Sequence, residues 1–195
     1  LCAKSLGTAP IETKVLVRGN PHTTGRTVAP GVPSVLGNTE FQANSAPHEE
    51  SPGLRRAFAE WLTEDENPVS SRVAANRLWQ HHFGRGIVES SDDFGHLGTK
   101  PTHPQLLDWL ATELVRQDWS MKEMHRLLLT SSAYRMSNTF DENAYLKDPK
   151  NDLLWRHEMR RLSAEELRDS ILATAGVLNP TLGGESIYPP LPRAV

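Results

Sequence analysis

Histidine and aspartate side chains are concentrated between positions 81 and 96 of this 195-residue chain, at His81, His82, Asp92, Asp93 and His96. Imidazole and carboxylate groups together suit a zinc or non-haem iron site. Adjacent residues of a helix point about 100° apart, so His81 and His82 cannot both face one metal ion. One of the two histidines could join His96 and either Asp92 or Asp93 in such a site, but no HExxH or HxH spacing supports it. We therefore predict no metal site in this chain.

The same stretch could contribute to a catalytic cleft. Arg77, His81 and Asp93 supply a cation, a base and a carboxylate, and His22 could join them from the N-terminal part of the chain. In an enzyme, these groups should gather in one concave pocket with perturbed pKa values. Glycoside hydrolysis needs two carboxylates across a sugar site. The sequence places no second carboxylate opposite the acidic residues of this stretch, so the reaction stays open.

A structural interpretation competes with the catalytic one. Asp92-Asp93-Phe94-Gly95 contains the letters of the kinase magnesium motif, but the chain has neither a glycine-rich phosphate loop nor an HRD loop. A tight turn explains the same residues, with an aspartate carboxylate accepting backbone N–H groups and Phe94 packing in the core. Asp93 could also pair with Arg77 or Arg85.

Four further residues are candidates for binding: Arg18, Asn20, His82 and His96. Arg18 and Asn20 lie with His22 in the sequence RGNPH, which could line a cleft against a helical body. The alternative for RGNPH is a turn stabilised by the Asn20 side chain. The alternative for the adjacent histidines is that one packs beside a tryptophan and the other lies at the helix end, where a cation is favoured.

Charge and cysteine content exclude several classes of function. The chain has 21 Lys and Arg, 24 Asp and Glu, and a net charge of -3, so it lacks the positive surplus of a nucleic-acid-binding protein. Cys2 is the only cysteine, which excludes an internal disulfide, a thiolate zinc site and a CxxCH haem attachment. We expect no cofactor in this segment. Apolar runs fall short of the roughly 20 residues of a membrane span.

Helix start signals recur along the chain. Proline follows serine or asparagine at Ser51-Pro52 and Asn67-Pro68, where a helix start needs no N–H donor. Capping-box spacing precedes three apolar repeats, at Thr102–Gln105, Ser120–Glu123 and Ser163–Glu166. Residues at helical spacing are the predicted core, among them Trp61, Leu78, Trp79, Phe83, Leu107, Trp109, Leu110, Leu114, Met124, Leu128, Leu129, Leu167 and Ile171.

These signals predict a mainly α fold, an irregular multi-helix domain with an extended N-terminal arm and an extended C-terminal tail. Residues 12–18 alternate like one short strand within the arm. We expect an arm over 1–50 that packs on the helical body, a helical domain over 51–180 and a tail over 181–195. The first residue is not methionine, and we expect one domain that is a fragment of a longer protein.

The chain resembles the planctomycete-type domain of unknown function 1553. The resemblance spans about residues 11–192 and is carried by VLVRGNPHTTG, VAPGVPSVLG, NPVSSRVAANRLWQHHFGRGIVESSDDFGHLG, MHRLLLTSSAYRMS and LLWRHEMRRLSAEELRDSILATAGVLNPTLGG. It implies the C-terminal module of a large exported bacterial protein, hence an extracytoplasmic location. It also implies upstream domains in the same polypeptide, often including a cytochrome-c-like domain that carries haem. The family has no established activity, so it transfers no catalytic residues.

Three functions remain open on these observations. The first is an accessory, structural or binding module whose partners are the upstream domains. The second is an enzyme or enzyme subdomain that acts on polysaccharide, with a cleft of His, Asp and Arg side chains. The third is a docking module for a fused haem domain.

Overall fold

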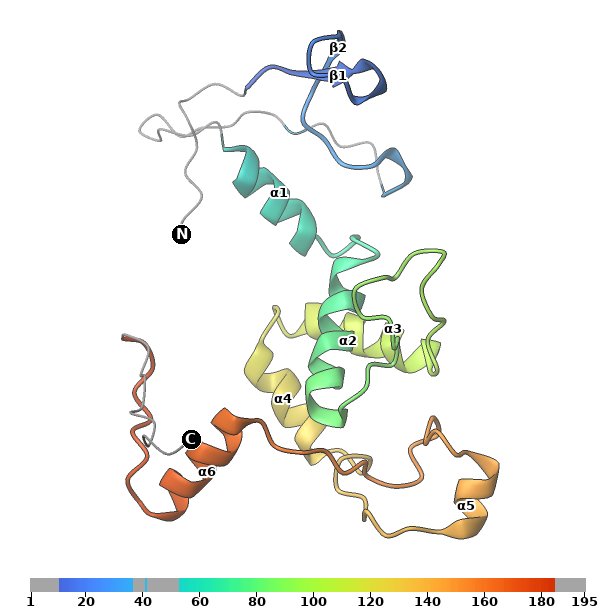
Figure 1. The fold of residues 1–195 in the computed structure, drawn as a ribbon, viewed down its shortest axis with the longest axis vertical. Helices are drawn as coiled ribbons and strands as arrows, with labels where there is room; N and C mark the ends of the chain where they lie inside the picture. The colour runs from blue at the N-terminus through green and yellow to red at the C-terminus, as the bar shows by residue number, and fades with distance from the viewer. Residues whose placement is uncertain (1–10, 37–40, 42–52, 185–195) are drawn as a thin grey trace, which may run out of the picture. The chain divides into compact units, whose positions relative to one another are not determined.

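The computed structural model describes residues 11–36, 41 and 53–184. These residues form six α-helices, two short 3-10 helices and one two-stranded sheet, which confirms the mainly α prediction (Figure 1). The chain divides into two compact units, residues 1–158 and 159–195, which we describe separately. The domain boundaries predicted from sequence stay a prediction, and most of the predicted tail lies outside the described residues. No helix in the described ranges is long and apolar enough to cross a membrane.

The N-terminal segment contains a β-hairpin. Strand β1 (Thr13–Leu16) pairs antiparallel with β2 (Thr24–Val28), with Thr13 opposite Val28. A short 3-10 helix, η1 (Val17–Gly19), begins the connection, and a second, η2 (Ser34–Leu36), follows the hairpin. The predicted strand at 12–18 is therefore present, but its partner was missed. The sequence of β2, TGRTV, has no apolar alternation, so it carries no strand signal.

Helix α1 (Leu54–Thr63) leads into the joint at Asn67. The predicted start at Ser51-Pro52 lies outside the described residues. Asn67 is buried, and its Oδ1 accepts hydrogen bonds from the backbone N–H groups of Val69 (3.1 Å) and Ser70 (3.0 Å). Its Nδ2 donates to the Trp61 carbonyl at 3.1 Å, so one side chain caps the next helix and ties it to α1.

The core forms where α2 (Ser70–Phe83), α3 (Pro104–Arg116) and α4 (Met121–Thr130) meet. Figure 1 shows α3 and α4 against α2. The buried apolar cluster consists of Ala75, Leu78, Trp79, Phe83, Ile87, Val88, Leu107, Leu110, Ala111, Leu114, Met124 and Leu128. Two predicted core residues, Trp109 and Leu129, are instead exposed. Trp79 stacks on Phe83 with ring centroids 3.9 Å apart, so two aromatic rings of α2 occupy the centre of this core.

The predicted capping box at Thr102–Gln105 is wrong. His103 is the N-cap of α3, and no side chain caps that helix. The Thr102 hydroxyl is used elsewhere, because it donates to the Ile87 carbonyl at 3.4 Å and lies 3.0 Å from Nδ1 of His103. The predicted box at Ser120 and Glu123 is half present, since the Ser120 hydroxyl accepts from the Glu123 N–H at 3.5 Å but the Glu123 side chain makes no return bond to the Ser120 N–H. The box at Ser163 and Glu166 is complete in both directions.

Two helices follow the core. Helix α5 (Glu142–Lys147) is capped by Asp141, whose Oδ1 accepts from the Ala144 N–H at 2.9 Å. Helix α6 (Ala164–Thr174) belongs to the second unit. Leu167 and Ile171 of α6, predicted as core, are exposed. Helical spacing marks an apolar face, but it does not show that another element covers the face.

The pKa of Glu166 provides a test of the α6 capping box. Hydrogen bonds from the Arg160 guanidinium and then from the Ser163 backbone N–H lower this pKa from 4.5 to about 2. A carboxyl pKa depressed by folding stabilises the folded form above the unfolded value, and this stabilisation disappears as pH falls through the folded value. The helix start is therefore expected to lose its carboxylate cap between pH 4.5 and about 2.

Arg160→Met is expected to move the Glu166 pKa upward towards 4.5, because the strongest contact to the carboxylate is removed. The measurement is an NMR titration of the Glu166 side-chain carboxyl. Arg168→Met is the matched control, since Arg168 pairs with Asp169 at 3.8 Å. An unchanged Glu166 titration in Arg160→Met would contradict the assigned contact.

Candidate functional site

A buried asparagine, Asn76, fixes the path of the chain after α2. Asn76 is 0% exposed, and its Oδ1 accepts from the Val88 N–H at 2.8 Å while its Nδ2 donates to the Val88 carbonyl at 3.0 Å. The side-chain amide thus pairs with both backbone polar groups of one residue and draws the chain back against α2. Gly86 is required between them, because a Cβ there would overlap the Val88 carbonyl oxygen and lie 2.7 Å from Nδ2 of Asn76. Sequence reasoning assigned Asn76 no role.

The acidic stretch after Val88 is a closed loop. The Ser90 hydroxyl donates to the Asp93 carbonyl at 2.7 Å and accepts from the Thr99 N–H at 2.8 Å. The Ser90 N–H in turn donates to Oγ1 of Thr99 at 3.0 Å. The Asp93 carboxylate accepts from the Gly95 N–H at 2.8 Å, which confirms the tight-turn interpretation of this sequence. Phe94 is half-buried against the core, also as that interpretation expected.

The arginines predicted as partners of Asp93 pair with other carboxylates. Arg77 lies 3.2 Å from Asp92, and this pair is exposed, with 57% of the Arg77 side chain and 93% of the Asp92 side chain accessible. Arg85 contacts Asp152 at 2.6 Å and donates to the Lys150 carbonyl at 2.9 Å. Arg85 therefore joins the end of α2 to the loop after α5.

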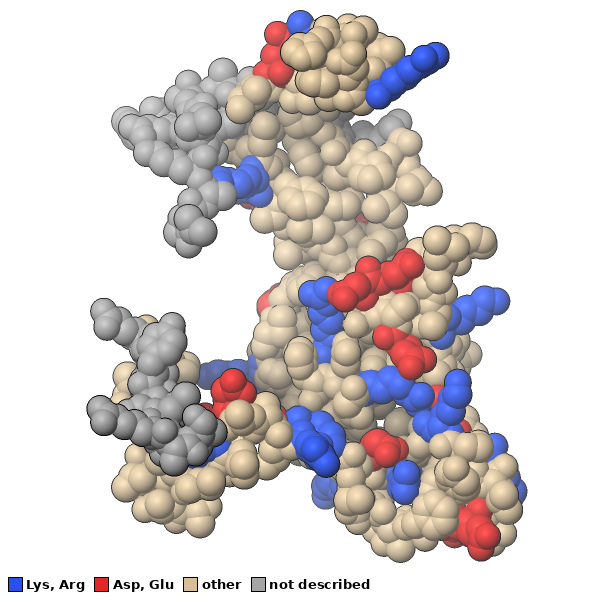
Figure 2. All heavy atoms as spheres, in the orientation of Figure 1, with Lys and Arg blue, Asp and Glu red and all other residues tan. Residues whose placement is uncertain are grey.

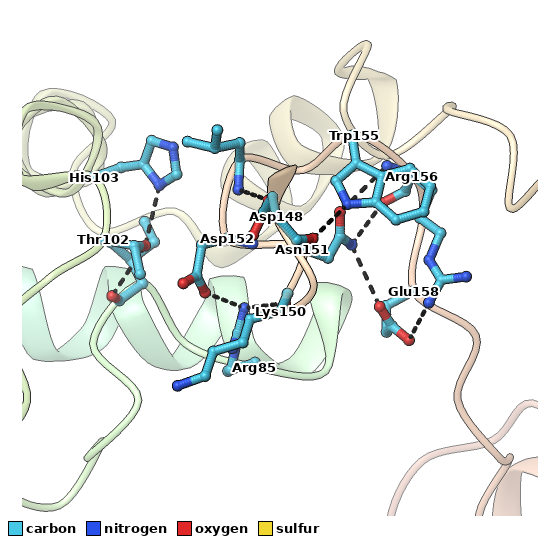
Figure 3. A network of polar contacts seen from close by, with 12 residues as sticks. Arg85, Thr102, His103, Asp148, Lys150, Asn151, Asp152, Trp155, Arg156 and Glu158 are labelled. Atoms are coloured by element: carbon cyan, nitrogen blue, oxygen red, sulfur yellow. Dashed lines mark hydrogen bonds and ion pairs between the residues drawn. The ribbon is translucent and has the colours of Figure 1, made fainter. Parts of the chain in front are cut away.

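Figure 3 shows the polar network in that loop. The Asp148 carboxylate accepts from the Asp152 N–H (2.9 Å) and the Leu153 N–H (2.7 Å), and the Asp148 carbonyl accepts from Nε1 of Trp155 (2.9 Å). Asn151 has a positive φ of 56°, and its amide bonds both the N–H and the carbonyl of Arg156. Asp148-Pro149 and Asn151 are turn-forming residues, so the sequence carries a local signal for this turn.

The adjacent histidines diverge, as helix geometry requires. His81 is exposed. His82 is half-buried, and its Nε2 lies 2.8 Å from Nδ1 of His125 on α4. Tyr134 packs edge-on against the His82 ring at 5.9 Å and against the ring of His157 at 5.1 Å. Sequence reasoning missed His125 and His157, because only the packing of α4 and of the loop after α5 brings these two residues close to His82 and Tyr134.

No group of three or more His, Cys, Asp or Glu side chains that could hold a metal ion occurs within the ranges that the structure describes. His96, a binding candidate, is exposed in the 89–99 loop. Two further binding candidates, Arg18 and Asn20, lie in the hairpin connection. Asn20 accepts there from the His22 N–H at 2.9 Å, which confirms the turn interpretation of RGNPH, and Arg18 has a left-handed backbone with φ of 52°.

An open groove of about 520 Å³ runs along one face of α2. Its lining is mostly apolar and consists of Leu62, Val69, Ser70, Val73, Ala74, Arg77, Leu78, His81 and Met121. Two of the four catalytic candidates, Arg77 and His81, therefore share this groove. The other two, Asp93 and His22, are absent from its described lining. The catalytic assignment of these four residues stays a prediction.

Acidic and basic side chains are interspersed on the face shown in Figure 2. Charged side chains of the described residues form ion pairs, as Arg72 does with Asp108 at 2.7 Å and Arg116 with Glu113 at 2.6 Å. Hydrogen bonds from Arg116 and Gln117 lower the pKa of Glu113 to about 2. Such pairing neutralises the basic side chains locally.

Comparison with known proteins assigns the family. The model of the family described as "Protein of unknown function (DUF1553)" matches residues 54–195, which is most of the chain. The chain belongs to the DUF1553 family. The resemblance recognised in the sequence is thereby confirmed, and the hairpin lies outside the matched range. No curated protein and no solved structure matches this DUF1553 chain.

Proposed function

We propose that this DUF1553 domain is a binding module of a larger, exported, multidomain polypeptide. The α2 groove would take up an amphipathic helix that belongs to an upstream domain of the same polypeptide. The observation that supports this proposal is the polarity of the groove lining, which changes from apolar to basic along α2.

The lining follows the geometry of a helix-binding face. Positions four residues apart form one row along a helix. Two neighbouring rows of α2 line the groove: the first is Val69, Val73, Arg77 and His81, and the second is Ser70, Ala74 and Leu78. Leu62 and Met121 add apolar walls from α1 and α4. A helix laid into such a groove buries apolar side chains that recur every three or four residues.

The basic end of the groove favours an acidic residue on the occupant. Arg77 is bound to Asp92 only through an exposed pair, and exposed pairs contribute about 0–1 kcal/mol, so a partner carboxylate can replace Asp92 at low cost. His81 adds a second polar group one turn further along. Met121 is 46% exposed, and its unbranched side chain can adapt to a partner surface.

The test is to produce this chain and the upstream part of its parent polypeptide separately and to measure their association by calorimetry. Val73→Asp is expected to weaken the association by at least about tenfold, because it places a charged carboxylate among the apolar contacts that the partner would cover. Arg77→Gln is expected to weaken it less and to reduce its dependence on salt concentration.

Leu97→Asp is the matched control, since Leu97 is 92% exposed and lies outside the groove lining. Circular dichroism and thermal melting establish that each variant is folded. Equal affinity of Val73→Asp and the unmodified chain, or the absence of any association, would refute the proposed function.

A further inference from the structure

An exposed aromatic surface lies outside the groove lining, at α5 and in the loops before and after it. Phe140 is 56% exposed and Tyr145 42% exposed, and their ring centroids are 5.4 Å apart. Trp155 is half-buried, and its ring lies 6.1 Å from that of Phe140. We call Phe140, Tyr145, Trp155 and Arg156 the aromatic shelf. The Arg156 guanidinium carbon lies over the Trp155 ring, 4.9 Å from its centroid, and over the Phe140 ring, 5.8 Å from its centroid, so it covers part of one face of each ring.

We propose that the aromatic shelf binds a neutral polysaccharide through its sugar rings. One face of a pyranose ring presents C–H groups, which pack on an exposed aromatic ring, whereas the hydroxyl groups at its edge both donate and accept hydrogen bonds. The shelf offers both kinds of contact. This proposal uses different residues from the groove and does not depend on the proposed function.

The polar part of the shelf is the pair of Arg156 and Glu158. The guanidinium Nη2 lies 3.4 Å from Oε1 of Glu158, whose Oε2 accepts from Nδ2 of Asn151, also at 3.4 Å. Both contacts are long for charge-assisted hydrogen bonds, so the carboxylate of Glu158, with 51% of its side chain exposed, retains capacity to accept from a ligand hydroxyl.

The same pair favours a sugar over an apolar protein surface. Covering a guanidinium and a carboxylate with apolar groups removes their hydration without replacing its hydrogen bonds. A hydroxyl-rich ligand replaces those hydrogen bonds, because it can donate to Glu158 and accept from Arg156. Since the two charges cancel, the shelf gives no general preference for an anionic polymer.

Hydrogen bonds hold the segment around Trp155 and Arg156 in place before any ligand arrives. Trp155 donates to the Asp148 carbonyl, and Asn151 bonds both backbone groups of Arg156, as Figure 3 shows. The Asp141 side chain caps α5, which carries Tyr145. A ligand therefore binds at Trp155 and Arg156 with little entropic cost of ordering their backbone.

The test is electrophoresis of the 195-residue chain through native gels that contain soluble xylan, hydroxyethylcellulose, galactomannan or, as an anionic comparison, pectin. At least one of the three neutral polymers is expected to slow the unmodified chain. Phe140→Ala is expected to weaken that binding by about tenfold or more, because the most exposed ring of the shelf is removed. Glu158→Gln is expected to weaken it by a smaller factor, since the amide keeps an acceptor but loses the charge.

Trp109→Ala is the matched control, because Trp109 is an exposed aromatic residue of α3, outside the shelf. Retardation of this variant should equal that of the unmodified chain, and thermal melting reports the folding of each variant. Unretarded migration in all three neutral gels, retardation by pectin alone, or full retention of binding by Phe140→Ala would each overturn the proposal. In those cases the exposed rings would be assigned to protein contacts.

Discussion

Asn76→Ala is expected to lower the free energy of unfolding by roughly 3–5 kcal/mol, because it leaves two buried backbone groups without partners. The Asn76 amide bonds the N–H and the carbonyl of Val88, and both residues lie in the interior, with Asn76 at 0% and Val88 at 3% exposure. Water cannot replace these bonds without opening the packing of the segment against α2. Urea denaturation followed by circular dichroism measures the loss.

Asn76→Asp separates the two halves of this interaction. Aspartate keeps an acceptor for the Val88 N–H but places a carboxylate oxygen against the Val88 carbonyl, so it is expected to destabilise the fold at neutral pH. Asn138→Ala, at an exposed position, is the control and is expected to change the free energy of unfolding by less than about 0.5 kcal/mol. A loss below about 1 kcal/mol for Asn76→Ala would show that Val88 finds other partners.

The helices of the core could be predicted because their signals are local. A capping residue acts within one turn, as Asn67 does for α2 and Ser163 for α6. Apolar spacing identified the buried Leu78, Phe83 and Leu114 for the same reason. The errors at Trp109 and Ile171 share one cause, since spacing defines an apolar face but not the neighbour that covers it.

In the candidate site, too, contacts between residues close in sequence were predicted, and contacts between distant residues were missed. The turns at Asp93 and Asn20 were predicted, because each side chain bonds a backbone N–H only two residues away. The pairing of His82 with His125 spans 43 positions, and the Asn76–Val88 pair spans 12, so the packed fold creates both. Asn76 did carry a usable signal, because an amide among Ala75, Leu78 and Trp79 on the apolar face of a helix needs a buried partner.

Gly98→Ala is expected to have the second largest effect, because no side chain fits at this position. An added Cβ would overlap the carbonyl group of Asp93 and lie 2.9 Å from the Ser90 hydroxyl oxygen. The obstruction is backbone rather than a flexible side chain, so the loop must open. The loss of stability is expected to be roughly 2–3 kcal/mol, the upper range for overpacking.

The loop that opens is the one closed by Ser90 and Thr99, so its amide protons report the change directly. The Thr99 N–H, which donates to the Ser90 hydroxyl, is expected to exchange faster with solvent deuterium in Gly98→Ala. Gly95→Ala is the matched control in the same loop, because its Cβ would meet only the Asp93 carboxylate oxygen, at 3.0 Å, and a small shift of that side chain makes room. If both variants lost equal stability, the close approach of Gly98 to Asp93 would not be what fixes this loop. A loss of stability in Gly98→Ala alone would show that a backbone contact, which tolerates only glycine, holds the acidic stretch in place.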